Sequence, residues 1–341
     1  MKPLLKWTWW KFDEYKFFKD FIPKNINTYI EPFFWWGWVF FQLQPKKSII
    51  NDKSNDLIQF YNKILDDNFH KEILEVLKIW NYSEDLKYIW IDYFKNKDEN
   101  KLNNYQFNTK YINDDLKKEL IKSLIDKKKR ISLIEEKNKI IFSWNELFDH
   151  IETALKSWIY MYFRWIINKK YKTTLNYSAV WFFVREFCYA SMFRYNKNWE
   201  FNVPYGWISY NKKDILSKIN AINSEDVKKL FINTTIYNLD FEDFFKSIYI
   251  DNDDFIFLDP PYDSEFSSYD NNEFNKSDQL RLRNLLKWLT CKWMVVIKNT
   301  DYIYNLYKEF NIIDFDKTYM YDVKGRNKDN KNVKHLIITN Y

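Results

Sequence analysis

Residues 254–262 read DFIFLDPPY, the most informative stretch of the chain. The apolar run that precedes Asp259 is continuous, as in a strand buried on both faces of a parallel sheet. Ligands of open α/β sheets bind at the carboxyl ends of the strands. We therefore expect the Asp259 carboxylate, the Pro260 carbonyl and the Tyr262 ring to project together into a site.

An exocyclic amine on a heteroaromatic base suits this arrangement. Its two N–H groups need two acceptors, which Asp259 and the Pro260 carbonyl supply, and its ring needs a stacking surface, which Tyr262 supplies. Pro260 and Pro261 stiffen the turn. The plainer interpretation is an Asp-Pro turn that ends a strand, but the full tetrapeptide after an apolar run favours the functional one.

Similar apolar runs recur near both ends of the chain, and helix-like segments separate them. Alternating strands and helices predict an α/β class with a mostly parallel sheet and helices on both sides. In the helix expected over 277–289, Ser277 is the predicted N-cap and Asp278 lies in the first turn. The remaining expected strands are 28–34, 48–52, 234–241, 293–299 and 335–341.

The middle of the chain differs from its ends. Residues 67–170 are charged and helix-like, which predicts an inserted helical domain. The expected organisation is a sheet domain formed by residues 1–66 and 232–341, with an insert over residues 67–231.

Composition limits the class of protein. The chain carries 53 Lys and Arg against 47 Asp and Glu, a net charge of +6 that suits a polyanionic partner. Two cysteines cannot form a disulfide framework, and neither a signal peptide nor a membrane-spanning run is evident, so a cytoplasmic protein is expected. The three histidines show no ligand spacing, so no metal site is predicted.

Glycine and tryptophan are used abnormally. The chain has 3 glycines and 16 tryptophans in 341 residues, whereas average usage of about 7% would give about 24 glycines. The stretch EPFFWWGWVFF (31–41) places three tryptophans around one glycine at an expected strand-to-helix turn, where glycine is usually required.

Four motifs together resemble the Dam-type (D12 class) adenine-specific DNA methyltransferases. DPPY is joined by LKWTWWK (5–11), EPFFWWGWVFF (31–41) and INDKSNDLI (50–58), in the family's order and over nearly the whole chain. The resemblance implies a Rossmann-like S-adenosylmethionine-dependent methyltransferase sheet with an inserted, mainly helical target-recognition domain that binds DNA. It implies methyl transfer from S-adenosyl-L-methionine to the N6 amine of an adenine flipped out of double-stranded DNA.

The resemblance also assigns residues. Asp52 is expected to hold the ribose hydroxyls of the cofactor, and Asp240-Phe241, expected to end the third strand, to bind and stack on its adenine. The plainer alternatives are that Asp52 and Asp240 cap helices, that Phe241 is an ordinary core residue and that Lys11 is a solvated surface charge. The expected catalytic residues are Asp259, Pro260, Pro261 and Tyr262. The expected cofactor contacts are Trp7, Lys11, Glu31, Pro32, Phe33, Asp52, Asp240, Phe241 and Asp259.

A second set of residues is expected to contact DNA. In REFCYASMFRYNKNWEFNVPYG (185–206), Arg194 matches a base-reading arginine of the family, and arginine is the side chain that most often reads guanine. Met192, Asn202 and Pro204 match neighbouring contacts. A family asparagine is Ala190 here, which leaves the target sequence open. The alternative for Arg194 is a surface ion pair, and the Lys127–Arg130 run is interpreted as a solvated helix face.

Tryptophan stands where the family has glycine at positions 9, 10, 35, 36, 38, 199 and 207. Our hypothesis is that UGA codons, which some bacteria read as glycine, are written here as tryptophan. Trp7 and Trp293 fit the family as they stand. The sequence leaves open whether Trp80, Trp90, Trp144, Trp158, Trp165, Trp181 and Trp288 are real. If the tryptophans at the glycine positions are real, the cofactor loop is blocked, and the alternative is a catalytically inactive DNA-binding relative.

A third alternative is an RNA or protein amino-methyltransferase, against which Asp259, rather than asparagine, argues. We expect a monomer. Whether a cognate restriction endonuclease is encoded nearby stays open.

Overall fold

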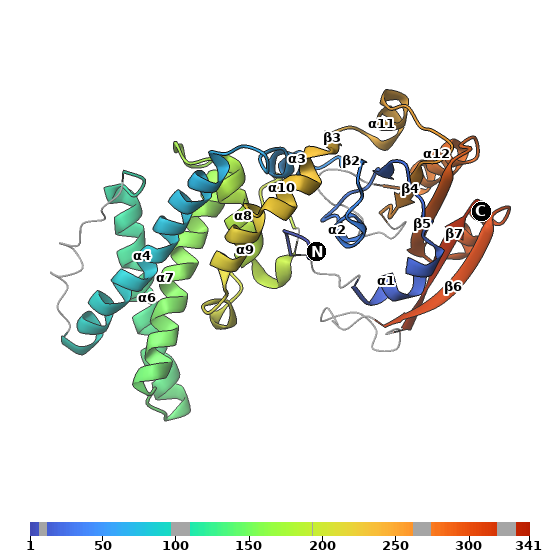
Figure 1. Cartoon of the computed structure of the whole chain (residues 1–341). Helices are drawn as coiled ribbons and strands as arrows, with labels where there is room; N and C mark the ends of the chain where they lie inside the picture. Colours follow the sequence, from blue (N-terminus) through green and yellow to red (C-terminus); the bar gives the residue numbers. More distant parts are fainter. Residues whose placement is uncertain (7–11, 97–109, 193, 262–273, 319–331) are drawn as a thin grey trace. The chain divides into compact units, whose positions relative to one another are not determined.

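A computed structural model describes residues 1–6, 12–96, 110–192, 194–261, 274–318 and 332–341. The chain divides into two compact units (Figure 1). One comprises Met1–Leu65 and Ser224–Tyr341, and the other comprises Asp66–Asn223.

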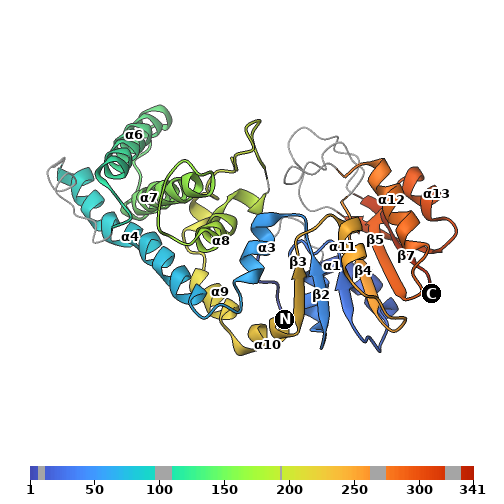
Figure 2. The same ribbon diagram turned by 90° about the horizontal axis from the view of Figure 1, so that it is seen from above.

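The first unit is built on a seven-stranded sheet in the order β3-β2-β1-β4-β5-β7-β6 (Figure 2). The five strands from β3 to β5 in that order run parallel, whereas β7 is antiparallel to both of its neighbours. The predicted α/β class and mostly parallel sheet are confirmed. The strands are β1 (Tyr29–Glu31), β2 (Ser48–Asn51), β3 (Thr234–Tyr237), β4 (Phe255–Leu258), β5 (Lys292–Lys298), β6 (Asn311–Thr318) and β7 (Asn332–Thr339).

Helices cover both faces of this sheet. Successive side chains of a strand point to opposite faces. Leu258 of β4 therefore packs into the core cluster with Leu282 and Leu286, whereas the neighbouring Phe257 stacks on Phe18 with 5.4 Å between ring centroids. The helices of this unit are α1 (Phe12–Phe18), α2 (Trp38–Leu43), α3 (Asn55–Asn62), α10 (Glu225–Ile232), α11 (Phe241–Ser247), α12 (Lys276–Leu286) and α13 (Asp301–Tyr307), with a 3-10 turn η1 (Lys19–Phe21).

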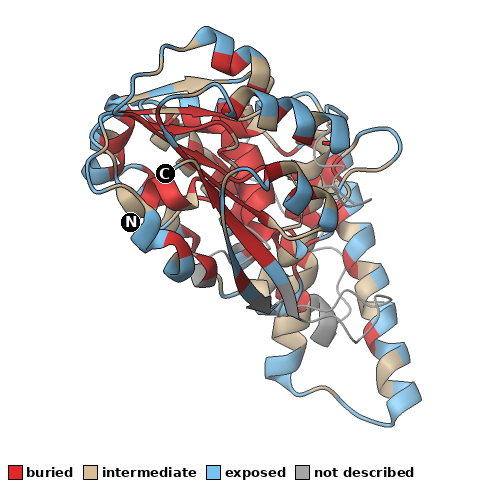
Figure 3. Ribbon diagram, turned by 90° about the vertical axis from the view of Figure 1, so that its right-hand side faces the viewer, coloured by how far each residue is buried: buried red, intermediate tan, exposed pale blue. Residues whose placement is uncertain are grey.

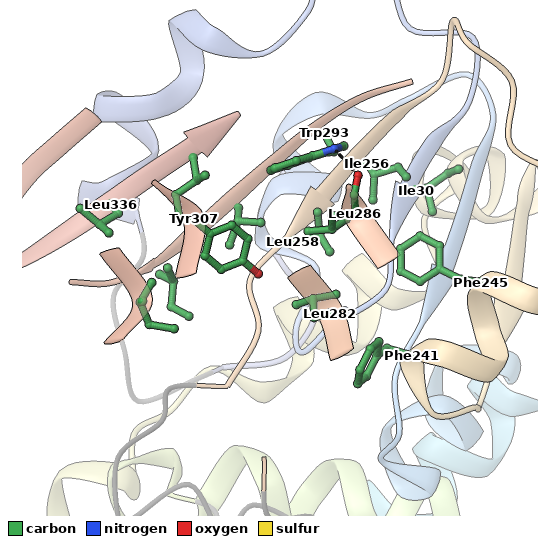
Figure 4. Packing of buried hydrophobic residues seen from close by; sticks show 14 of the residues in the cluster. Ile30, Phe241, Phe245, Ile256, Leu258, Leu282, Leu286, Trp293, Tyr307 and Leu336 are labelled. Carbon is green, nitrogen blue, oxygen red and sulfur yellow. Dashed lines mark hydrogen bonds between the residues drawn. The ribbon is translucent and has the colours of Figure 1, made fainter. Parts of the chain in front are cut away.

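The central strands are buried almost completely (Figure 3). All four residues of β4 are buried, which explains the continuous apolar run in the sequence. Trp293 of β5 is fully buried, and its indole N–H donates to the Leu286 carbonyl at 3.1 Å (Figure 4). The carboxyl end of β4 is thereby fixed within a rigid sheet.

The start of α12 differs from the prediction. Its N-cap is Asn275, not Ser277, because the Asn275 side chain accepts from the Ser277 N–H at 2.8 Å. Asp278 lies in the first turn, as predicted, and closes a capping box by accepting from the Asn275 N–H at 3.0 Å.

Asn275→Ala is expected to lower the free energy of unfolding by about 1 kcal/mol, because the first turn of α12 loses its capping acceptor. Ser277→Ala is the matched control and should cost less than half as much. Urea unfolding followed by tryptophan fluorescence measures both variants. If the Ser277 variant proved the weaker of the two, Asn275 would not be the functional cap.

The second unit is helical over residues 67–170, as the sequence predicts, apart from the part not described. Of the Lys127–Arg130 run on α6, Lys129 and Arg130 are exposed while Lys127 is half-buried; burial, and then the nearby Arg130, lower the pKa of Lys127. No helix of the described residues is long and apolar enough to cross a membrane. The helices are α4 (Phe69–Asn96), α6 (Asp114–Asn138), α7 (Trp144–Ile167), α8 (Tyr177–Phe187) and α9 (Ile215–Ile222), with 3-10 turns η2 (Tyr189–Ser191) and η3 (Ile208–Tyr210).

Candidate active site

Three carboxylates lie at the carboxyl ends of three neighbouring parallel strands. Glu31 is the last residue of β1, Asp52 follows β2 and Asp259 follows β4. These strands are adjacent in the order β2-β1-β4, so the carboxylates share one edge of the sheet. Glu31 and Asp259 are 3% and 7% exposed. The sheet therefore brings together the acidic residues that the sequence predicted for the site.

Asp52 holds the loop that follows β1. Its Oδ2 accepts from the Trp35 N–H at 2.8 Å, and its Oδ1 accepts from the Ser54 N–H at 2.8 Å. These two hydrogen bonds brace the turn after β1. Asp52 is not the helix cap, because the N-cap of α3 is Ser54. Asp52 is partly exposed, so the carboxylate also faces outward from the sheet edge.

The loop itself is tight. The Gly37 N–H donates to the Phe34 carbonyl at 2.7 Å, and Gly37 has φ 65°. A Cβ at position 37 would lie 2.3 Å from the Phe34 ring, so only glycine fits. Trp35 also has a positive φ, of 50°.

Tryptophans line the hollow beside the carboxylates. Trp35, Trp36 and Trp38 share this hollow with Glu31 and Asp259. The Trp35 indole N–H donates to the main-chain carbonyl of Asp259 at 2.8 Å. Its remaining walls are Phe18, Phe34, Val39, Phe257 and Val296. In the sequence as written, three indoles therefore line the hollow beside two of the strand-end carboxylates, Glu31 and Asp259.

Asp240 and Phe241 do not end the third strand, which stops at Tyr237; that expectation was wrong. Asp240 is the N-cap of α11 and accepts from the Glu242 N–H at 3.1 Å. Phe241 is buried in the core cluster, and the Arg281 guanidinium lies 4.8 Å from its ring centroid. A short connection outside the strand joins β3 to this cap. The Asn51 side chain accepts from the Leu239 N–H at 2.9 Å and holds this connection in place.

The remaining predicted residues are placed as follows. Pro260 is buried, and the Pro261 carbonyl accepts from the Gln279 side chain at 2.9 Å. The Pro32 carbonyl accepts from the Asn51 amide at 3.0 Å, and Phe33 packs against Phe241 with 5.7 Å between ring centroids. Trp7, Lys11 and Tyr262 lie outside the described residues.

In the second unit, the predicted DNA contacts lie on one hairpin. Tyr195 and Phe201 form an antiparallel bridge. Just beyond it, Arg194 is exposed and its Nε donates to the Asn202 side chain at 2.8 Å. Pro204 is exposed on the opposite arm of the hairpin, which also carries Asn202, and Met192 is partly buried. Among the described residues, Arg194 forms this hydrogen bond to an amide rather than the ion pair named as the alternative, and its side chain stays exposed, as a contact with DNA would require.

Sequence reasoning missed Arg185. This α8 residue is 2% exposed, and its guanidinium donates to the carbonyls of Met192 at 2.8 Å and Ser191 at 2.9 Å. It fastens the turn in which Ala190 and Ser191 have φ values of 50° and 51°. No signal in the sequence marks an arginine as buried, so only the structure reveals this anchor.

The neighbouring Glu186 is also fully buried. Burial alone would raise its pKa, but Lys213 at 2.9 Å and Lys218 at 2.6 Å outweigh burial and hold the pKa low.

Among the described residues, no group of three or more His, Cys, Asp or Glu side chains could hold a metal ion.

The family and the relatives to which the chain is similar are methyltransferases. The D12 class N6 adenine-specific DNA methyltransferase family matches residues 10–321. The chain is 29% identical over 343 residues to the type II methyltransferase M.CviBI of Paramecium bursaria Chlorella virus NC1A, covering 100% of both. It is 28% identical over 359 residues to the type II methyltransferase M.MjaIII of Methanocaldococcus jannaschii, covering 100% of this chain and 99% of that relative. A shorter similarity, 28% over 163 residues, covers 47% of this chain and 54% of the retron Ec67 DNA adenine methylase of Escherichia coli.

Proposed function

The chain belongs to the D12 class of N6 adenine-specific DNA methyltransferases, and from this premise we propose how its residues perform the reaction. The resemblance seen in the sequence is confirmed, and the protein is an adenine-specific DNA methyltransferase. The family implies S-adenosyl-L-methionine as the methyl donor and DNA as the substrate. The observation that carries the assignment of residues is the position of Asp259 directly after β4, at the carboxyl edge of the parallel sheet.

We propose that the two units divide the work. The sheet unit is a Rossmann-like catalytic domain, which the run of five parallel strands supports. The helical unit is the target-recognition domain, which the hairpin bearing Arg194 and Asn202 supports.

Some residues of the site suit the methyl donor, and others do not. Glu31 and Asp52 are carboxylates at strand ends, the kind of acceptor that holds ribose and methionine groups. The indoles of Trp35, Trp36 and Trp38 line and narrow the hollow beside Glu31 and Asp259. In the sequence as written, three indoles crowd the loop that would have to approach the donor, so the donor does not fit this loop.

On the adenine side, the chemistry follows from the chain's own groups. The Asp259 carboxylate and the Pro260 carbonyl each accept a hydrogen bond from one N6–H of the flipped base, and Tyr262 stacks on its ring. These two hydrogen bonds favour a pyramidal nitrogen, whose lone pair is out of conjugation with the ring. The lone pair is then available as the nucleophile, and positioning of the two reactants supplies much of the acceleration.

Recognition of the target is assigned to the hairpin. Arg194 reads a guanine in the major groove, with Asn202 orienting its guanidinium and with Met192 and Pro204 beside it. Two of the relatives are named type II methyltransferases. We propose that this chain likewise protects DNA sites against a cognate restriction endonuclease.

Arg194→Ala is expected to cost about 1–3 kcal/mol at one base pair and to relax specificity there. Binding to a randomised duplex library, followed by sequencing of the bound fraction, measures the preference at each position without any need for cofactor. Lys129→Ala, an exposed charge on α6, is the control. A uniform loss at every base position would mean that Arg194 contacts phosphate instead.

The proposed function is tested by transfer of labelled methyl groups. Duplex DNA is incubated with enzyme made under the codon assignment of its own organism, then hydrolysed and separated into nucleosides. N6-methyladenine should carry the label, while RNA and protein substrates should stay unlabelled. Label on another base or only on RNA would overturn the proposal.

One observation favours a second function. If the three loop tryptophans are real, a hollow lined by their indoles favours a DNA-binding relative without catalysis. Such a protein would bind duplex DNA through the hairpin and transfer no methyl group.

A further inference from the structure

Three tryptophans have backbone conformations that belong to glycine. Trp35, Trp199 and Trp207 have φ values of 50°, 60° and 74°. A positive φ is uncommon for any side chain and an outlier for a bulky one. The 16 tryptophans less Trp7, Trp9 and Trp10 leave 13 in the described residues. Three of these 13 with positive φ is therefore far above the few per cent expected.

Trp207 is the most restrictive of the three. Its φ of 74° and ψ of −177° fall in a region that essentially only glycine occupies. The residue before it, Gly206, is itself obligatory, because a Cβ there would lie 2.5 Å from the Tyr210 ring. The Trp207 side chain is 67% exposed, so burial of the indole does not offset the strain.

Trp199 closes the turn of the recognition hairpin. Its N–H donates to the Asn196 carbonyl at 2.9 Å, and Asn196 in turn donates its N–H to the Glu200 carbonyl at 2.9 Å. A left-handed residue directly after such a turn is usually glycine. Here it is a tryptophan with 56% of its surface exposed.

Trp35 occupies the loop beside the candidate active site. Its backbone N–H is fixed by Asp52 at 2.8 Å, so the positive φ is imposed by the fold of the loop. Its side chain donates to the Asp259 carbonyl at 2.8 Å and lines the hollow beside Glu31 and Asp259. Glycine at this position would satisfy the backbone and open the hollow.

Two other tryptophans in the part of the chain that the structure describes do not share this pattern. Trp293 is fully buried with its indole hydrogen-bonded at 3.1 Å. Trp80 is buried in α4 and stacks on Phe187 with 4.1 Å between ring centroids. Both have the surroundings of a large aromatic residue, so the positive-φ group is distinct.

We propose that positions 35, 199 and 207 are glycine in the functional protein, because UGA codons that the organism reads as glycine are written here as tryptophan. The scarcity of glycine, 3 residues against 16 tryptophans, is then a consequence of the same reading. The backbone argument holds at positions 199 and 207 whatever the enzyme does. The opening of the hollow at position 35 rests on the proposed function.

Peptide mass spectrometry of the protein purified from the organism that carries the gene tests the proposal directly. Glycine is expected at positions 35, 199 and 207. Tryptophan at these positions would overturn it, whether or not the protein methylates DNA.

A second experiment tests the backbone argument in recombinant protein with the sequence as written. Trp207→Gly and Trp207→Ala both remove the exposed indole, but only glycine relieves the strained φ, so Trp207→Gly should have the higher Tm. The same pair of changes at Trp165, within α7 (Trp144–Ile167), is the matched control, and there alanine should give the higher Tm. Reversal of the order between the two positions supports the proposal. The same order at both positions would overturn it.

Discussion

Asp259→Ala is expected to lower the rate of methyl transfer at least about a hundredfold, the scale of effect seen when one preorganised polar group is removed from a reacting centre. The N6 amine loses one of its two proposed acceptors, so its lone pair is no longer directed toward the methyl group. Duplex binding should change little, because phosphate contacts supply most of the affinity. The background is the seven-glycine version, with glycine at positions 9, 10, 35, 36, 38, 199 and 207.

Two further variants sharpen this experiment. Asp259→Asn keeps the shape of the side chain but places a donor where an acceptor is needed, so its activity should fall nearly as far. Asp253→Ala removes an exposed carboxylate from the loop before β4 and should leave the rate unchanged. Methyl incorporation and gel-shift assays are run on the same preparations. An Asp259→Ala enzyme that kept more than about a tenth of the rate would exclude this carboxylate as the key acceptor.

The strands at the centre of the sheet were predictable because burial on both faces makes their sequences continuously apolar. Each residue of β4 is buried, and five of the seven residues of β5 are as well. The β6 strand was missed because NIIDFDKT mixes charges with apolar residues, as an edge strand with a solvated face does. Ser277 was mistaken for the cap because Asn275, two residues earlier, offers the same acceptor chemistry.

The site was predictable to the extent that it depends on strand ends. The sequence placed Asp259, Glu31 and Asp52 at or near strand ends, and the strand order β2-β1-β4, which the sequence did not give, puts them on one edge of the sheet. The cap role of Asp240 was the plainer alternative offered by the sequence, but the end of β3 at Tyr237 was not predicted, since the Asn51 side chain holds the Leu239 N–H beyond it. Arg185 was not predictable, since its burial depends on a turn with two left-handed residues.

The second large effect concerns cofactor binding. The protein as written should bind S-adenosylhomocysteine at least about a hundredfold more weakly than the seven-glycine version, a difference of about 2.7 kcal/mol. The reason is steric, because Trp35, Trp36 and Trp38 line the hollow next to Glu31 and Asp259. The Trp35 indole N–H also donates a hydrogen bond to the Asp259 carbonyl. Removing three indoles exposes the strand-end carboxylates to the ligand.

Isothermal calorimetry measures the affinity, with Trp288→Gly in the as-written background as the control. Trp288 is 82% exposed, so its removal should leave the affinity unchanged and show that losing an indole is not by itself sufficient. Circular dichroism confirms that every version is folded, which separates a blocked hollow from an unfolded chain. Equal affinities for the as-written and seven-glycine versions would mean that the ligand does not use this hollow, and the tryptophans would then be native parts of a different site. Tight binding of S-adenosylhomocysteine to the seven-glycine version and weak binding to the as-written protein would instead give one cause for two observations. Tryptophan written in place of glycine would explain both the positive φ of Trp35 and the indoles that line the hollow.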